Sequence, residues 1–479
     1  MLVLMKNNYK ILIFIFIFSL FFSCEINKKR KLPNIILIMT DDQGWAQTGY
    51  YNHPILKTPN LDEMAKNGIR FDRFYAGAPQ CSPTRATILT GRSNDRTGVF
   101  YHGYPLNKNE KTIAQVLKKK GYKTGHFGKW HLNGLRGPGV PIFKEDNHGP
   151  GFFGFDEWLS VTNFFDIDPI MSHNGDFIEL KGSSSEIIVN QALKFIKDYS
   201  NMNIPFFTVI WDGSPHTPML ASEKDRYDFK ALGERSQNHY GEIVAFDRSL
   251  GFLRKELKKL GIYENTIIWF CSDNGGLSNV IPSSVGQLKG FKNSMWEGGI
   301  RVPAIIEWPE KIKPKVSSYP ASTMDIVPTI LDIVGIPISE MLNPIDGISL
   351  KPLFKSKIQK RLVNIPFRFD DRGAMIKNNI KLFVKSVENL EFELYDLNRD
   401  PMETVNISKE YPLIFEMIKK DYLLWNYSIE NSIDGNDYEN PELENDFSPK
   451  VWNNDSRYKP FFDNWSKRPE YKNWIIKSD

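Results

Sequence analysis

Cysteine is scarce in this chain, with three residues among 479, which is too few for a framework of disulfide bonds. The sequence has no internal repeat and no low-complexity tract, so its composition is that of an ordinary globular protein. Neither sign of charge dominates, because 61 lysines and arginines face 57 acidic residues, for a formal net charge of +4. This balance predicts no nucleic-acid partner, and an anionic ligand would have to meet a local cluster of cations.

The longest apolar run is too short for a comfortable transmembrane span. It covers residues 11–22 and follows Lys6 and Lys10. A positively charged start, a short apolar stretch and a small residue before the cut describe a secretory signal, which we place at residues 1–23. The Phe-Phe-Ser-Cys sequence that ends at Cys24 resembles a bacterial lipobox, in which the cysteine is lipidated. The alternative is a plain signal peptide with an incidental cysteine.

Residues 24–33 would then form a tether between the lipid anchor and the folded protein. Its basic stretch, residues 28–31, would lie beside anionic lipid. We therefore expect an exported protein that is lipid-anchored at the bacterial outer membrane or in the periplasm, with a soluble periplasmic or secreted form as the alternative.

The following part of the chain alternates between buried strands and helices. Residues 34–39 form a continuous apolar run, which is typical of a buried parallel strand. Such alternation predicts an α/β fold with a large mixed, mostly parallel sheet between layers of helices. The further predicted strands are 206–211, 266–270 and 304–307, and the predicted helices are 59–67, 112–120, 186–199, 241–260 and 323–334.

The pattern changes around residues 340–365, and short alternating segments with turns follow at 367–406. Residues 381–385 and 392–395 are examples, and they predict a small C-terminal antiparallel sheet with a helix at 413–425 beside it. The last fifty residues are rich in asparagine, aspartate and aromatic residues without clear periodicity, which indicates a tail over the surface. The predicted divisions are a catalytic domain (34–360), an α+β subdomain (361–430) and an aromatic-rich tail (431–479).

Polar side chains directly follow two of the predicted strands. Asp41 and Asp42 follow the first, and Asp273 and Asn274 follow the strand that begins at residue 266. Sites in open α/β sheets form beyond the carboxyl ends of the strands, and three carboxylates with an amide oxygen suit Ca²⁺ or Mg²⁺. Either pair alone is more typical of a turn. Cys271, at the end of the second strand, is predicted to be an inert buried thiol.

Residues 78–92 form the most informative segment of the chain. Pro83 suits the first turn of a helix and Gly91 suits its C-terminal cap, so Cys81 is predicted to lie at a helix N-terminus, where anions are favoured. Arg85 lies one turn further on and can reach the same anion. The pattern indicates a nucleophile beside an anion site. The alternative is a helix start that happens to contain a thiol.

Cys-Ser-Pro-Thr-Arg at residues 81–85, followed by Leu-Thr-Gly-Arg at 89–92, resembles the signature of type I sulfatases in the alkaline-phosphatase-like superfamily. Thr84 is a mild departure, because serine is commoner there. The resemblance extends in order from about residue 34 to 406. Its other landmarks lie at 41–44, 58–62, 128–131, 272–275 and 297–303.

The resemblance implies one Ca²⁺ ion and a modified cysteine. In the family a maturation enzyme oxidises this cysteine to formylglycine (3-oxoalanine) before export, and one hydroxyl of the aldehyde hydrate completes the metal shell. The implied metal ligands are Asp41, Asp42, Asp273, Asn274 and the modified Cys81.

The resemblance also implies roles for five further side chains. Arg85 would steady the hydrate, Lys129 and Lys292 would hold the sulfate, His131 would help the hydrate react, and His216 would protonate the leaving oxygen. One more sulfate contact of the family has no assigned position here. Its candidates are Asn163, Asp166 and His173. Apart from His173, the other histidines have no assigned role; these are His53, His102, His126, His148 and His239.

These features predict an arylsulfatase-like sulfuric ester hydrolase that resembles bacterial lipoprotein polysaccharide sulfatases. The expected partner is a sulfated polysaccharide or its oligosaccharides, such as an algal glycan (ulvan, carrageenan, fucan) or a glycosaminoglycan. One alternative is a phosphatase or phosphotransferase of the same superfamily, which would need two metals, and another is a non-catalytic polysaccharide-binding lipoprotein. Four tail-region tryptophans are candidates for stacking on sugars or for simple packing: Trp425, Trp452, Trp465 and Trp474.

Overall fold

The structure is a computed structural model that describes residues 32–355, 358, 360–439 and 448–475. The predicted signal peptide, Cys24 and all but the last two residues of the predicted tether lie outside the described residues. Among the helices of the described part, none is long and apolar enough to cross a membrane. Residues Asn34–Asp479 form one compact unit.

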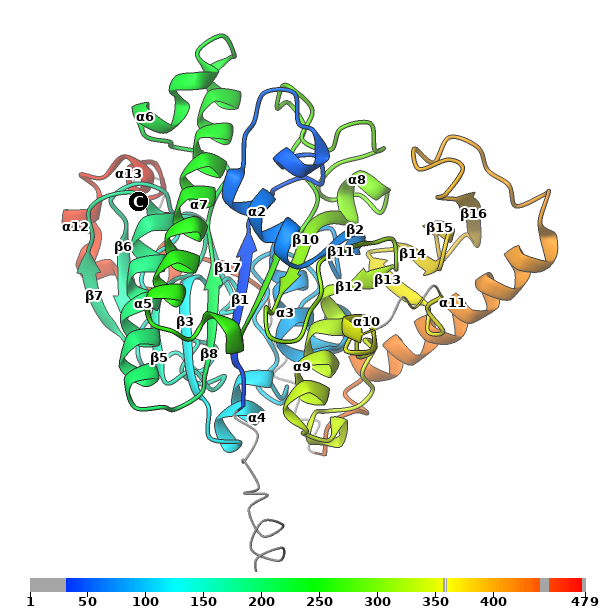
Figure 1. Ribbon diagram of the computed structural model, residues 1–479, viewed down its shortest axis with the longest axis horizontal. Helices are drawn as coiled ribbons and strands as arrows, with labels where there is room; N and C mark the ends of the chain where they lie inside the picture. Colours follow the sequence, from blue (N-terminus) through cyan, green and yellow to red (C-terminus); the bar gives the residue numbers. More distant parts are fainter. Residues whose placement is uncertain (1–31, 356–357, 359, 440–447, 476–479) are drawn as a thin grey trace, which may run out of the picture. The chain divides into compact units, whose positions relative to one another are not determined.

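The predicted buried strands lie side by side in the middle of one large sheet (Figure 1). β1 (Asn34–Thr40) pairs in parallel with β8 (Phe206–Trp211) and β9 (Thr266–Ser272), and every residue of the three strands is buried. The strand order is β11-β2-β10-β9-β1-β8-β3-β5-β6-β7, with β12 paired to β2. The other strands are β2 (Ile69–Tyr75), β3 (Lys123–Lys129), β5 (Glu157–Val161), β6 (Ile170–His173), β7 (Asp176–Glu179), β10 (Arg301–Glu307), β11 (Lys315–Ser317) and β12 (Ala321–Ser322).

The sheet is mixed and mostly parallel around β1, as the sequence predicted. β10 runs antiparallel to its neighbours β2 and β9, and β6 runs antiparallel to β5 and β7. The pairs β1–β8, β1–β9, β3–β8 and β3–β5 are parallel. The parallel strands therefore end along one edge of the sheet.

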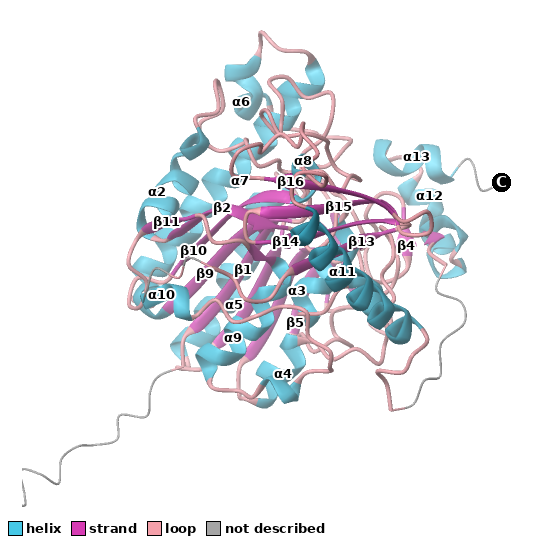
Figure 2. Cartoon of the chain, turned by 90° about the vertical axis from the view of Figure 1, so that its right-hand side faces the viewer, coloured by secondary structure: helices cyan, strands magenta, loops and turns pink. Residues whose placement is uncertain are grey.

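Helices cover both faces of this sheet (Figures 1 and 2). On one face Ile36 and Ile38 of β1 share a core with Leu61, Ile188 and Phe246 from three helices, because alternate residues of a strand point to the same side. Those helices are α2 (Pro59–Asn67), α5 (Ser184–Asn201) and α7 (Glu234–Lys259). The other face carries α3 (Cys81–Thr90), α4 (Ile113–Lys119) and α9 (Ile326–Val334).

A second, four-stranded sheet follows, and it is antiparallel as predicted. Its order is β13-β14-β15-β16. α11 (Pro412–Ile433) packs on it, with Ile418 and Tyr422 in a core that includes Leu382 and Leu394 of the sheet. This helix begins where the sequence predicted but runs eight residues further, to Ile433. The strands are β13 (Ile365–Phe369), β14 (Arg372–Lys377), β15 (Ile380–Ser386) and β16 (Glu391–Asp396).

The described part of the C-terminal tail is more regular than its composition indicated. β17 (Lys450–Val451) pairs with β4 (Leu135–Arg136), and two short helices follow, α12 (Phe462–Trp465) and α13 (Pro469–Ile475). Trp452 and Trp465 are buried in an aromatic cluster with Leu135. These two tryptophans therefore pack in a core and are not platforms for sugars.

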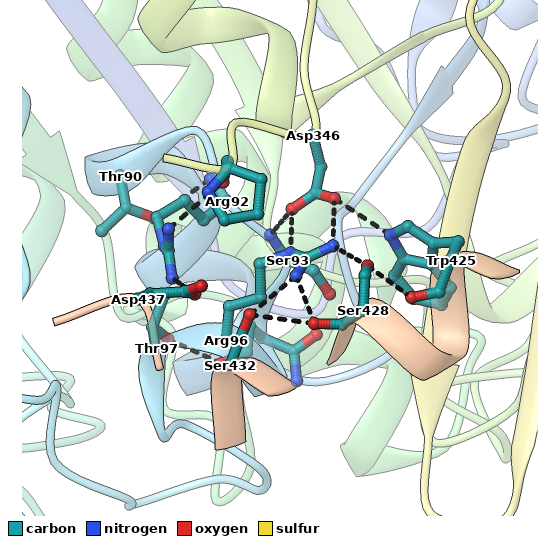
Figure 3. A network of polar contacts seen from close by, with 12 residues as sticks. Thr90, Arg92, Ser93, Arg96, Thr97, Asp346, Trp425, Ser428, Ser432 and Asp437 are labelled. Atoms are coloured by element: carbon teal, nitrogen blue, oxygen red, sulfur yellow. Dashed lines mark hydrogen bonds and ion pairs between the residues drawn. The ribbon is translucent and has the colours of Figure 1, made fainter. Parts of the chain in front are cut away.

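A buried polar network fastens α11 to the chain that leaves α3 (Figure 3). Arg96 pairs with both carboxylate oxygens of Asp346, at 2.9 Å and 3.1 Å, and donates to the carbonyl of Ser428 and the hydroxyl of Ser432. The indole of Trp425 donates to the same Asp346 at 2.9 Å. The segment that follows the sulfatase-like signature is thus bound to α11 of the C-terminal subdomain.

A second ion pair in this network involves the last residue of that signature. Arg92 is fully buried and lies between Glu110, at 3.2 Å, and Asp437, at 2.5 Å. Because buried charges are costly without a partner, each of these arginines depends on its carboxylates.

Replacing Asp346 should destabilise the fold strongly. Asp346→Asn leaves the guanidinium of Arg96 buried without its counter-charge, which should lower the free energy of unfolding by about 3–5 kcal/mol. Urea unfolding measures this loss. Asp332→Asn is the matched control, because Asp332 pairs with Lys351 at the exposed surface and should contribute less than about 1 kcal/mol. Equal losses in the two variants would contradict the structural role of the network.

Candidate active site

The candidate site begins where β1 and β9 end together. Thr40 lies opposite Ser272 in the parallel register, so the residues that follow leave the sheet at the same edge. The backbone N–H of Asp42 donates to Asp273 at 3.1 Å, and the amide of Asn274 donates to Asp42 at 2.7 Å. Carboxylate oxygens of Asp41, Asp42 and Asp273 lie within 4.8 Å of one another. The predicted cluster of acidic residues is therefore formed.

Three oxygens of this cluster have no hydrogen-bond partner among the described residues, although they are buried. They are Oδ1 of Asp41, Oδ2 of Asp42 and Oδ1 of Asn274. Burial, with Asp41 nearby, raises the pKa of Asp273 to about 7, and Arg85 only partly opposes this rise. Unpaired buried carboxylate and amide oxygens are the ligands that hard divalent cations prefer. The cluster therefore fits a metal ion.

Cys81 is the first residue of α3, as the sequence predicted. Gln80 is extended, and Gly91 ends the helix in the left-handed conformation with φ of 74°. Every residue of α3 is buried, and the sulfur of Cys81 lies within 4.8 Å of ligand atoms of Asp41 and His216. Burial raises the pKa of the Cys81 thiol despite the nearby lysines. The unmodified thiol is therefore a poor nucleophile at neutral pH.

Arg85 connects the helix to the acidic cluster. Its guanidinium donates to Asp41 at 3.1 Å, to Asp273 at 2.8 Å and to the carbonyl of Lys129 at 2.8 Å. It also lies over the ring of Trp211, 5.1 Å from the ring centroid. These contacts fix a cation one helical turn after Cys81.

Two lysines hold the acidic cluster from different segments. Lys129 ends β3 and donates to Asp41 at 2.5 Å, and Lys292, from a loop after β9, contacts Asp42 at 2.6 Å. Burial opposes the charge of Asp41, but Lys129 and the neighbouring cations outweigh it and lower the pKa of Asp41. Acidic and basic side chains thus lie together beside Cys81. The lysines are close enough to contact an anion that binds there.

His216 is held in one orientation beside the cluster. Its Nδ1 lies 2.5 Å from the carbonyl of Thr217, which can only accept, so Nδ1 carries the proton. Its Nε2 lies 3.9 Å from Asp42, and its ring stacks on Phe164 with centroids 5.1 Å apart and planes at 11°. Burial, together with Lys292 and Lys129, lowers the pKa of His216 to about 4.

His131 follows Lys129 closely and is also buried. Its backbone is left-handed, with φ of 57°. Neither of its ring nitrogens has a hydrogen-bond partner among the described residues. Burial, with Lys129 and Arg85 adding to it, lowers the pKa of His131 well below its ordinary value. This neutral ring is available to a ligand at the site.

The three candidates for an additional sulfate contact lie in different places. Asn163 follows β5, which pairs with β3 so that Val161 lies opposite Lys129, and its Oδ1 is buried without a partner among the described residues. Asp166 is further along, and burial beside Asp212 raises its pKa to about 8. His173 pairs with Glu157 at the opposite end of β5. The geometry therefore favours Asn163.

Most of the other histidines lie in packed or structural settings. His126 packs edge-on against Trp130 and Trp211, and His239 contacts the amide of Gln47. His102 differs, because it is exposed and its ring centroid lies 6.4 Å from that of His131. No sequence pattern indicated this position, since His102 belongs to none of the recognised motifs.

Comparisons with known proteins agree with this geometry. Residues 33–336 match the Sulfatase family, and residues 290–422 match the C-terminal region of N-sulphoglucosamine sulphohydrolase. The ulvan-active sulfatase of Formosa agariphila is 31% identical over 385 residues, which are 75% of this chain and 70% of that protein. Human N-acetylgalactosamine-6-sulfatase is 33% identical over 374 residues, which are 70% of this chain and 67% of that protein.

The fold is shared with solved structures as well. The crystal structure of Ps i-CgsB in complex with k-i-k-neocarrahexaose superposes with a TM-score of 0.74 at 25% identity, over 93% of this chain and 99% of that chain. The family match covers well over half of the chain. It contains Asp41, Asp42, Cys81, His216 and Asp273, which form two groups of neighbouring side chains that share Asp41. The chain belongs to the sulfatase family and is a sulfuric ester hydrolase.

Proposed function

We propose that this sulfatase removes sulfate from a sulfated carbohydrate through a formylglycine made from Cys81. The observation that carries the proposal is the position of the Cys81 sulfur, within 4.8 Å of ligand atoms of both Asp41 and His216. The substrate class is supported by relatives named for ulvan and for N-acetylgalactosamine 6-sulfate, and by a structural neighbour crystallised with neocarrahexaose. A sulfated polysaccharide or its oligosaccharides, from algal glycans or glycosaminoglycans, fits these relatives.

The cations of the site suit a sulfate ester. The ester carries negative charge on its free oxygens, and cleavage of the S–O bond adds charge to the leaving oxygen. Arg85, Lys129 and Lys292 are already fixed by carboxylates before a substrate arrives, so they need little rearrangement when that charge develops. The bound sulfate is therefore stabilised by a preorganised set of positive groups.

Conversion of Cys81 to formylglycine explains how this buried position can supply a nucleophile, although its thiol would be largely protonated. A hydrated aldehyde supplies one hydroxyl to attack sulfur and a second whose deprotonation releases the sulfate, an exit that an ordinary serine lacks. His131, with both nitrogens unpaired among the described residues, is placed to accept or return a proton at such a hydrate. Because all of α3 is buried, we expect the maturation enzyme to act on the unfolded chain.

The metal ion is proposed to be a single Ca²⁺. Asp41, Asp42, Asp273 and Asn274 would hold it together with the modified Cys81, and it would supply positive charge to the sulfuryl oxygens. The unpaired oxygens of Asp41, Asp42 and Asn274 are the structural support for this assignment.

His216 is proposed as the acid for the leaving oxygen. The carbonyl of Thr217 holds the proton on Nδ1, and the stack with Phe164 fixes the ring plane, so Nε2 faces the site. A bound sulfate brings negative charge next to the ring, which favours the imidazolium form that can donate a proton. Phe164 also limits the rotation of the ring away from the leaving oxygen.

The two alternatives fit the geometry less well. A two-metal phosphatase needs a second set of ligands, yet in the described ranges both groups of side chains that are close enough to share an ion contain Asp41. A non-catalytic binding protein would not need the convergence of Cys81, Arg85 and His216 on one point. A formylglycine sulfatase accounts for all of these residues together.

We further propose that the chain is exported and anchored at the outer membrane or in the periplasm through a lipid on Cys24. The support is the signal-like composition of residues 1–23 and the lipobox-like sequence. Mass spectrometry of the mature N-terminus tests the proposal, because an unlipidated N-terminus at another residue would exclude it.

Cys81→Ala should abolish sulfate release, because it removes the atom from which the nucleophile is made. The wild-type peptide that contains Cys81 should have the mass of the aldehyde and not of the thiol. Cys271→Ala is the control, since this second buried cysteine is the penultimate residue of β9 and should remain a thiol with turnover retained. Full activity from protein with an unmodified thiol at Cys81 would contradict the mechanism.

His216→Ala should reduce turnover according to the leaving group. For a sugar sulfate, whose alcohol is a poor leaving group, loss of the acid should cost roughly 10²–10⁴ in kcat. For 4-nitrophenyl sulfate the loss should be much smaller, because that leaving group needs little protonation. His173→Ala should affect neither substrate, because His173 ends β6 and pairs with Glu157 at the start of β5. A uniform loss on both substrates would refute the role of His216 as the acid.

Calcium should stabilise the protein, and increasingly so at higher pH. In metal-free protein burial raises the pKa of Asp273 from its ordinary range to about 7, so the stability that this group contributes is lost as the pH rises from that ordinary range through 7. Bound Ca²⁺ removes this penalty, and an ion at 100 times its Kd adds about 2.7 kcal/mol.

The rise in melting temperature on adding Ca²⁺ to chelator-treated protein should therefore be larger at pH 8 than at pH 5. Differential scanning calorimetry measures it, and Asp42→Asn should reduce the rise, whereas the surface variant Asp332→Asn should not. A calcium effect that is the same at both pH values, or that Asp42→Asn leaves intact, would contradict the assigned site.

A further inference from the structure

The loop that contains His102 is bound to both neighbours of the nucleophile. The side chain of Gln80 accepts from the backbone N–H of His102 at 2.9 Å, and the hydroxyl of Ser82 accepts from the N–H of Gly103 at 2.7 Å. Gln80 and Ser82 flank Cys81 directly. The position of His102 is therefore fixed relative to the reacting atom by two hydrogen bonds.

Hydrogen bonds also connect this loop to the segment that contains Lys292, on the other side of the site. The amide nitrogen of Gln80 donates to Asn293 at 2.8 Å, and Asn293 directly follows Lys292. Asn293 has a left-handed backbone with φ of 72°, and its N–H donates to the carbonyl of Pro79. One glutamine thus sets the spacing between the His102 loop, the nucleophile and a sulfate-holding lysine.

Arg136 lies against this loop, so its positively charged guanidinium is close to His102. Its Nε donates to the carbonyl of His102 at 3.1 Å. A side chain at Gly103 would meet the arginine, because a Cβ there would lie 2.6 Å from Cγ of Arg136, and Gly103 has a positive φ of 82°. The glycine therefore allows the arginine to approach the backbone beside His102.

The polar ends of both side chains remain available. His102 is exposed and Arg136 is half-buried. No carboxylate of the described residues pairs with Arg136, and its two terminal nitrogens have no partner there. Although the residue is exposed, part of its ring is desolvated, and this desolvation with the nearby cations lowers the pKa of His102 to about 4. Among these cations Arg136 acts on the ring most strongly, ahead of Lys292 and Lys129. The ring is thus a neutral hydrogen-bond donor at neutral pH.

We propose that His102 and Arg136 form a second anion subsite, which binds a carboxylate or a second sulfate of the substrate beside the sulfate that is removed. This inference rests on the proposed function and names the substrate class more closely. A planar guanidinium with two free nitrogens suits the paired oxygens of either group, and the nearby ring adds one hydrogen bond. With the ring of His102 centred 6.4 Å from that of His131, the subsite adjoins the sulfuryl pocket.

The charge of the site supports an anionic ligand over a neutral sugar. Lys129 and Lys292 are each engaged by a carboxylate of the acidic cluster, whereas Arg136 carries a charge without such a partner among the described residues. A partly buried cation of this kind gains most from an oxyanion, because a charge-assisted hydrogen bond is stronger than one to a hydroxyl. The substrate is therefore a sugar, or two linked sugars, with at least two negative groups.

The test compares substrates with one and with two anionic groups. The probes are 4-nitrophenyl sulfate, a disaccharide with one sulfate and one uronate, the same disaccharide after reduction of its carboxylate, and a disaccharide with two sulfates and no carboxylate. The measured quantity is kcat/KM for each disaccharide relative to 4-nitrophenyl sulfate. If wild-type enzyme hydrolyses none of the four, the proposed function itself fails.

Arg136→Ala should lower this ratio roughly 10- to 100-fold for a dianionic disaccharide and should not lower it for the carboxylate-reduced one. Whether the uronate or the disulfated probe loses more identifies the oxyanion. Arg136→Lys should give a smaller loss, because it keeps the charge without the planar fork. Arg399→Ala, an exposed arginine paired with Asp396, should leave every ratio unchanged. Equal ratios in Arg136→Ala and wild-type enzyme, or a loss that includes the reduced probe, would overturn the subsite.

Discussion

The structure depends on the burial of three carboxylates at the ends of two adjacent strands. Asp41, Asp42 and Asp273 lie within 4.8 Å of one another in the interior, where like charges repel strongly. Arg85, Lys129 and Lys292 contact these carboxylates and balance part of their charge. The buried oxygens that have no hydrogen-bond partner among the described residues mark the position proposed for a cation. The proposed metal site, the proposed sulfate site and the position of Cys81 all depend on this single arrangement of charge.

The C-terminal sheet supports that arrangement from outside the large sheet. Glu297, five residues after Lys292, accepts from the buried amine of Lys381 on β15 at 3.1 Å, and its N–H donates to Glu403 at 2.7 Å. On the other side, Arg96 and Asp346 fix α11 to the end of the segment that contains α3 (Figure 3). The small sheet and α11 therefore hold the two segments that contribute Cys81 and Lys292. The motif residues at 89–92 and 297–303 therefore have a structural role, because they support the site and lie outside it.

Local patterns predicted the parts of the molecule that depend on local physics. The apolar run at 34–39 predicted β1, and the proline in the first turn of α3 and the glycine that ends it predicted that helix; the structure confirms both elements. The acidic pairs were predictable as well, because residues after parallel strands share one edge. The packing of Trp452 against Leu135 was not, since it joins segments distant in the sequence. His102 was missed for the same reason, because its significance comes from hydrogen bonds to the neighbours of Cys81.

A crystal structure of the matured enzyme with calcium tests the central claim most directly. The anomalous difference map should show one peak among the side chains of Asp41, Asp42, Asp273 and Asn274, with oxygen distances of roughly 2.3–2.6 Å. The carboxylates would then be ionised and would share the ion with the modified side chain at position 81. An absence of any peak there, with the carboxyl groups protonated and hydrogen-bonded to one another, would contradict the account.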